Sequence, residues 1–263
     1  MQHEKSILCG DVTSEETKET AFVLRFHAIF CLVSAVALRT CLIHSSYEQY
    51  EHNGNIGDVD GCNDVGNTLS LLVAYWHIII LVQSVRWYPR LLSYYRFLLP
   101  FSLFQVLPDL FLVKFHRTLH FPINGSTWMI CDAVSPCMAG MWSIPGLMVL
   151  YLSYPNDTYS TDLSRYYTVY VKATCASLFI LGLAEQLFPF IWHPTEQVKI
   201  FGWGKGIALY VLPAEALLGP TIVYAYHVTK DGPWWYSTIG AAMTMLVYTG
   251  SLSIGLLAIE VLS

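Results

Sequence analysis

The chain has 263 residues, of which 54% are hydrophobic and only 13% are charged. Soluble domains carry about 25% charged residues, so this composition indicates a protein whose apolar surface lies in lipid and excludes a separate soluble catalytic domain. The net charge of −5 comes without any basic block, which argues against a nucleic-acid partner.

The apolar stretches predict an all-α fold: a polytopic membrane helix bundle with about seven transmembrane helices in one domain, since each span takes about 20 residues. A polar tail over residues 1–20 precedes this domain and is too charged to form the core of a signal peptide. The domain itself covers residues 21–263. Its predicted spans are 21–43, 69–88, 91–115, 128–154, 166–191, 201–228 and 234–263.

The positions of lysine and arginine near the span ends predict the orientation. Nine of the 14 basic residues fall on the side of the N-terminus. The opposite side has the remaining five and a long loop, 44–68, which contains acidic residues but no lysine or arginine. We therefore expect a multi-pass protein of the endoplasmic reticulum membrane with a cytosolic N-terminus. The sequons at Asn124 and Asn156 then fall on opposite sides, so at most one is used.

Four carboxylates inside the predicted spans are the most informative residues, because an intramembrane charge costs several kcal/mol unless it is partnered or functional. They are Asp109, Asp132, Glu185 and Glu215. With a rise of about 1.5 Å per residue, three of them share one half of the bilayer and Glu215 borders it. This predicts one polar pocket that opens toward the non-cytosolic face. Pro108 and Pro213 precede two of these acids and predict helix kinks beside them.

Aromatic residues are predicted at the same depth. An interfacial belt accounts for Trp128, Trp192, Trp234 and Trp235, whereas three other rings lie too deep for a belt. Ring faces stabilise cations, and an apolar environment favours the neutral form of a carboxyl, which donates protons. We expect Asp109, Glu185 and Glu215 to be catalytic. The expected substrate-binding residues are Trp76, His77, Gln105, Asp132, Trp142 and Tyr210.

Other chemistries lack their motifs. The chain has no DDxxD run to hold magnesium and a diphosphate, and neither GxSxG nor a P-loop. One HxxxH pair, His116 and His120, is far short of the histidine boxes of a di-iron oxygenase. The seven cysteines have no CxxC spacing, which favours small core residues over a disulfide framework. No metal and no cofactor is therefore expected.

Several segments carry a resemblance to a known family. They are Phe104–Val113, Leu119–Gly125, Met138–Pro145, Glu185 and Ile207–Gly219, and they span over two fifths of the chain. This pattern resembles the membrane-bound terpene cyclases of fungal meroterpenoid pathways, of the ascochlorin/macrophorin type, within a wider family of small multi-spanning membrane proteins. The resemblance implies metal-free cyclisation of a prenylated, often epoxidised, aromatic substrate, with Asp109, Glu185 and Glu215 as motif positions. A departure from the pattern is Lys205, where a histidine is expected.

These observations support the hypothesis of a terpene cyclase initiated by protonation. Its partners would be a lipophilic prenylated substrate, membrane lipid, and an upstream prenyltransferase and epoxidase. Two alternatives remain open. A proton-coupled transporter of a small molecule or lipid would use the same acids as a relay, although no sequence repeat is present. In a structural scaffold, the acids would pair with Arg39, Lys114 and Lys205.

Overall fold

The computed structural model describes residues 16–40, 62–121, 129–153, 163–187, 192–202 and 206–262. Loop residues 44–61, both sequons and Lys205 lie outside these ranges. The described helices are Glu16–Thr40, α2 (Cys62–Arg86), α3 (Pro89–Phe104), α4 (Val106–Phe111), η1 (Leu112–His116), α5 (Met138–Met141), α6 (Ser143–Ser153), α7 (Leu163–Leu187), α8 (Val211–Thr229), α9 (Trp234–Leu256) and η2 (Leu257–Val261). The strands are β1 (Leu119–His120), β2 (His193–Pro194), β3 (Ile200–Phe201) and β4 (Ile207–Ala208).

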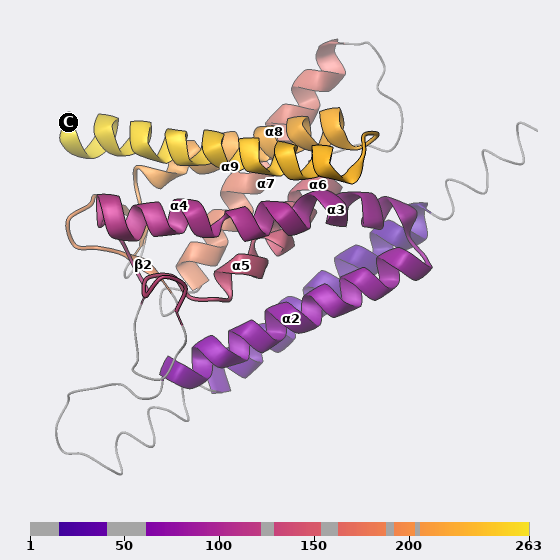
Figure 1. The fold of residues 1–263 in the computed structure, drawn as a ribbon, viewed down its shortest axis with the longest axis horizontal. Helices are drawn as coiled ribbons and strands as arrows, with labels where there is room; N and C mark the ends of the chain where they lie inside the picture. The colour runs from indigo at the N-terminus through magenta and orange to yellow at the C-terminus, as the bar shows by residue number, and fades with distance from the viewer. Residues whose placement is uncertain are drawn as a thin grey trace, which may run out of the picture.

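The helices form one bundle, which confirms the predicted all-α class (Figure 1). The helix Glu16–Thr40 lies along α2 on one flank, where the Trp76 indole donates a hydrogen bond to His27 Nε2 over 3.2 Å. The helix α3 runs on through α4 and η1. A hairpin of α8 and α9 packs on α3 and α7, and α8 also contacts α6. The short strands pair antiparallel, β1 with β2 and β3 with β4.

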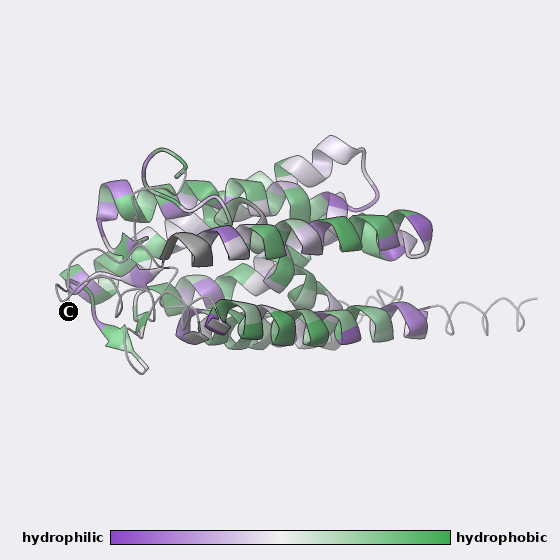
Figure 2. Ribbon diagram, turned by 90° about the horizontal axis from the view of Figure 1, so that it is seen from below, coloured by the Kyte–Doolittle hydropathy of each residue, from purple (hydrophilic) through white to green (hydrophobic). Residues whose placement is uncertain are grey.

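The outer surface has the character of a membrane protein. Five helical segments in the described residues are long and apolar enough to cross a bilayer: Glu16–Thr40, Gly66–Arg86, Pro89–His116, Tyr167–Gln186 and Trp234–Val261. Apolar residues occupy most of these helices, with polar residues gathered mainly toward their ends (Figure 2). Large apolar side chains face outward, among them Leu71 at 72% and Phe179 at 71% exposed. In a bilayer this surface contacts lipid.

Two of the predicted spans have wrong boundaries. The span 128–154 becomes helical only at Met138, because residues 129–137 form turns in which Cys131 and Asp132 adopt left-handed backbone angles, φ 53° and 51°. The span 201–228 becomes helical only at Val211. Glycine is the cause there, since Gly202 and Gly206 adopt φ 103° and 60° beside β3 and β4.

The described helix Glu16–Thr40 includes the last residues of the predicted polar tail over residues 1–20. Its buried Glu19 accepts a hydrogen bond from the hydroxyl of Tyr151 on α6, and Arg90 lies over the Tyr151 ring, 5.3 Å from its centroid. A partnered carboxylate extends the helix beyond the apolar residues from which its start was predicted.

Helices α7 and α8 approach so closely that a glycine is required between them. A Cβ atom at Gly219 would overlap the backbone oxygen of Ala173. The Ser177 hydroxyl donates to the backbone oxygen of Glu215 over 2.7 Å and fixes the same contact. The position of α8 in the bundle, and of its acidic residue, therefore depends on this interface.

We expect Gly219→Ala to lower the free energy of unfolding by about 1–3 kcal/mol, because the two helices must separate to admit the methyl group. Thermal unfolding in detergent measures this change. Gly250→Ala on α9 is the matched control, since a Cβ there meets nothing within 4 Å, and it should be neutral or slightly stabilising. Equal melting temperatures for the two variants would contradict the close packing.

Candidate active site

A small cavity with both polar and apolar walls lies at the end of the bundle where β1, β2 and β4 gather. Its volume is about 30 Å³, enough for a water molecule but far below the 300–1,000 Å³ of an ordinary ligand pocket. The helices α4, α5, α7, α8 and α9 and the three strands all contribute to it. Its walls are Asp109, Leu112, Thr118, Leu119, Met138, Trp142, Glu185, Trp192, Pro194, Ala208, Tyr210, Val211 and Tyr248.

The helix formed by α3, α4 and η1 positions Asp109. Pro108 has no N–H to donate to the preceding turn, and Gln105, between α3 and α4, keeps helical angles of φ −60° and ψ −25°. The Gln105 amide then donates to Asp109 Oδ1 over 3.3 Å. Only 4% of Asp109 is exposed, and its Oδ2 atom has no hydrogen-bond partner among the described residues. The backbone stays helical through Gln105 and Asp109, and one carboxyl oxygen of Asp109 at the cavity is left without a partner in the described part of the chain.

Glu185 and Glu215 continue a row of acids away from Asp109. Glu185, near the end of α7, lies within electrostatic range of both Asp109 and Glu215. Glu215 on α8 is fully buried, and neither of its carboxyl oxygens has a partner among the described residues. Pro213 lies in the first turn of α8, where proline is tolerated, so the kink predicted there is instead a helix start. The structure thus brings the three predicted catalytic acids together.

Three aromatic rings surround the acids. The Tyr210 and Thr118 hydroxyls form a hydrogen bond of 2.7 Å, which ties the start of α8 to the segment before β1. Trp142 and Tyr248 contact each other, with ring centroids 5.8 Å apart. The indole N–H of Trp142 has no partner among the described residues. The site therefore has ring faces and an unused donor next to the carboxyls.

The other predicted substrate-binding residues lie elsewhere. Trp76 is buried against the first helix, and His77 bridges the Tyr95 hydroxyl and the Gly140 carbonyl at 3.0 Å each. Neither residue lines the acid cavity. Asp132 is exposed in a turn rather than buried in a span, so its assignment to the pocket is wrong. Gln105 touches the site through Asp109.

Sequence reasoning missed three polar or aromatic wall residues: Thr118, Trp192 and Tyr248. Trp192 was predicted to lie in an interfacial belt, but it is 8% exposed and lines the cavity. Thr118 lies between η1 and β1, outside any helix, so no helical pattern in the sequence indicates that it is buried. Tyr248 did leave a signal, because it shares one helical face with Ala241, Met245 and Leu252, all buried. A hydroxyl on that apolar face indicates an inward polar position.

The described part of the chain offers no cation to the three acids. Arg39 and Lys114, two of the expected partners, are exposed, and the cavity walls contain neither lysine nor arginine. The described residues also contain no group of three histidine, cysteine or acidic side chains close enough to hold one metal ion. The arrangement suits carboxyls that exchange protons better than carboxylates held in ion pairs.

The family model described as a domain of unknown function, DUF6989, matches residues 106–259. The match covers more than half of the chain, so the protein belongs to this family. All the cavity walls, from Asp109 to Tyr248, lie inside the matched region, whereas Trp76, His77 and Gln105 lie outside it. No curated protein and no solved structure matches the chain.

We expect Glu215→Met to leave the free energy of unfolding unchanged or to raise it. A buried ionisable group without a partner costs stability, and an apolar residue of similar volume removes that cost. Thermal unfolding of the purified protein in nanodiscs measures the effect. Ser177→Ala calibrates it, since loss of its 2.7 Å hydrogen bond should cost about 1 kcal/mol. A loss of about 3 kcal/mol or more for Glu215→Met would instead indicate a structural ion pair.

Proposed function

We propose that the protein is an integral-membrane terpene cyclase. In this proposal it cyclises the prenyl chain of a meroterpenoid intermediate by protonation and without a metal, and the substrate carries an epoxide or an alkene at the end of the chain. The main observation behind this proposal is a single cavity whose walls include the carboxyls of Asp109 and Glu185 and the rings of Trp142, Tyr210 and Tyr248. The sequence motifs that resemble fungal membrane-bound cyclases add support.

Asp109 is the proposed proton donor. Its proton moves to the epoxide oxygen, the C–O bond to the more substituted carbon breaks, and the double bonds of the chain attack in turn. With an alkene, the proton adds to the terminal carbon instead. The faces of Trp142, Tyr210 and Tyr248 stabilise the first cation, which forms beside the acid, and the small volume of the cavity limits the water that could quench it.

Glu185 is the proposed acceptor of the last proton, because it lines the same cavity as the donor. Loss of a C–H proton to Glu185 gives the final double bond, so the product is an isomer of the substrate. Glu185 is in electrostatic range of Asp109 and Glu215, which allows the proton to return to Asp109 between turnovers. Glu215 itself does not line the cavity and serves in this scheme as the third member of the relay.

The substrate and its source follow from this chemistry. A prenylated aromatic compound partitions into the bilayer, so we propose that the cyclase takes it from the lipid of the endoplasmic reticulum membrane. An upstream prenyltransferase would attach the chain and an epoxidase would supply the terminal epoxide. With the cytosolic N-terminus proposed from charge placement, the acid cavity lies toward the lumenal side.

A proton-coupled transporter is the alternative use of the same acids. Such proteins bind their cargo near the bilayer midplane between structural repeats. Here the walls of the acid cavity come from one end of the bundle, beside β1 and β2. A flux experiment in proteoliposomes separates the two functions, since a cyclase forms product without an ion gradient and a transporter moves an unchanged compound only with one.

We expect membranes from a heterologous host that expresses the protein to cyclise an epoxyfarnesyl phenol. Asp109→Asn and Glu185→Gln should each lower kcat/KM by about 10²–10⁴-fold, the usual contribution of a general acid or base. Liquid chromatography with mass spectrometry measures the product.

Glu196→Gln is the matched control, because Glu196 is exposed and lies in the turn after β2. It should retain the parental rate. If Asp109→Asn and Glu185→Gln both cyclise the substrate at the parental rate, the acid assignment is wrong.

A further inference from the structure

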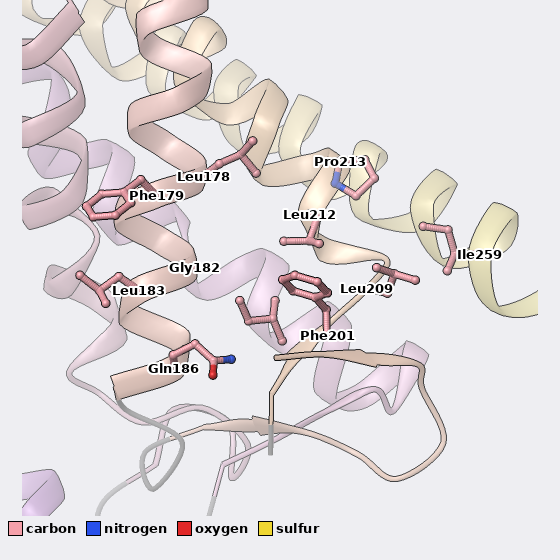
Figure 3. Close-up of a pocket in the computed structure, with 11 residues that line it drawn as sticks. Leu178, Phe179, Gly182, Leu183, Gln186, Phe201, Leu209, Leu212, Pro213 and Ile259 are labelled. Carbon is pink, nitrogen blue, oxygen red and sulfur yellow. The ribbon is translucent and has the colours of Figure 1, made fainter. Parts of the chain in front are cut away.

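A second hollow lies on the outside of the bundle, next to the acid cavity. It is a groove of about 780 Å³ between α7, the strands β3 and β4, the start of α8, and η2 (Figure 3). Its walls are apolar except for Gln186, at the last turn of α7. Phe179 and Leu183 on its α7 side are 71% and 47% exposed, so the groove is open to the lipid phase.

One layer of backbone separates this groove from the acids. Ile207, Leu209 and Leu212 line the groove, whereas Ala208, Tyr210 and Val211 line the acid cavity. The segment 207–212 therefore presents alternating side chains to two hollows. On α7 the same division separates Gln186, in the groove, from its neighbour Glu185, in the cavity. The segment 207–212 and the end of α7 therefore each border both hollows.

The two hollows differ so much in volume that they cannot hold the same part of a substrate. The acid cavity, at about 30 Å³, admits water or one small group, but no isoprenoid chain. The groove, at about 780 Å³, lies within the range of ordinary ligand pockets. Gly182 contributes to this space, because a Cβ atom there would already lie 3.5 Å from Ile207 Cδ1. A larger side chain at this position would fill the groove at the partition.

We propose that the groove binds the isoprenoid tail of the substrate and delivers its reacting end to the acids past the side chain of Ile207, between the segment 207–212 and Gly182 of α7. This inference rests on the proposed function. The position of the groove next to the acids identifies its occupant. An isoprenoid chain ends in an alkene or epoxide that the carboxyls can protonate, whereas the acyl chain of a phospholipid offers them nothing to protonate.

Photolabelling of the full-length protein in nanodiscs tests the groove. The probe is a farnesyl phenol that carries a diazirine in place of its terminal double bond, so that it binds but has no alkene there to protonate. We expect crosslinks in peptides that contain residues 178–186 and 207–213. Gly182→Leu should reduce this labelling at least fivefold, and Gly250→Leu, at an open helical position, should leave it within twofold of the parent.

Two further arms keep the test decisive. Leu183→Trp fills the groove from a half-exposed position that tolerates bulk, so it replaces Gly182→Leu if that variant does not fold. Excess unlabelled farnesyl phenol should abolish the crosslinks, whereas excess phosphatidylcholine should not. Labelling that survives both groove variants, or that phosphatidylcholine displaces, would show an ordinary lipid surface and overturn the proposal.

The result is separable from the proposed chemistry. Asp109→Asn should keep the groove crosslinks while it loses cyclisation, because Asp109 does not line the groove. Specific groove labelling without any cyclisation by the parent would remove the cyclase proposal and leave an isoprenoid-binding site. Cyclisation that depends on Asp109 but is unchanged by Gly182→Leu would overturn the groove and leave the cyclase proposal intact.

Discussion

The cost of holding carboxyl groups in a low-dielectric interior is the constraint on which the rest of this structure depends. Asp109 and Glu215 are 4% and 0% exposed, and three of their four carboxyl oxygens lack a hydrogen-bond partner among the described residues. Each unpartnered polar group of this kind costs on the order of 1–3 kcal/mol. A bundle of this size is only marginally stable as a whole, so it keeps such groups when function requires them.

The surrounding fold can be understood as the support for these groups. The Gln105 amide supplies Asp109 with one donor, and the tight contact at Gly219 holds α8 so that Glu215 faces inward. The antiparallel strand pairs close the end of the bundle with irregular backbone. Such backbone is tolerated at membrane depth only where protein buries it or where it lines a cavity, and Ala208 of β4 does line one.

The sequence alone predicted the helical class and the cluster of Asp109, Glu185 and Glu215, because hydropathy and the scarcity of charge are strong signals in lipid. It failed where apolar residues adopt a non-helical backbone. Residues 129–137 are apolar enough to resemble a span, but left-handed angles at Cys131 and Asp132 expose that carboxylate. The assignment of Trp76 failed for another reason: its ring is buried, but hydropathy cannot assign a buried ring to one helix interface rather than another.

In the proposed cyclase, the separation of a small acidic cavity from a large apolar groove would address a conflict in acid-driven cyclisation. A wide pocket around the carboxyls would hold many water molecules, which lower the strength of electrostatic interactions and quench cations. A pocket too narrow for the substrate, on the other hand, could not bind it. In the proposed cyclase, a partition one backbone layer thick, with Ile207 and Leu209 on one side and Ala208 and Tyr210 on the other, would limit the water around the acids until the chain arrives. The lipid-facing groove then supplies the binding volume that the acid cavity lacks.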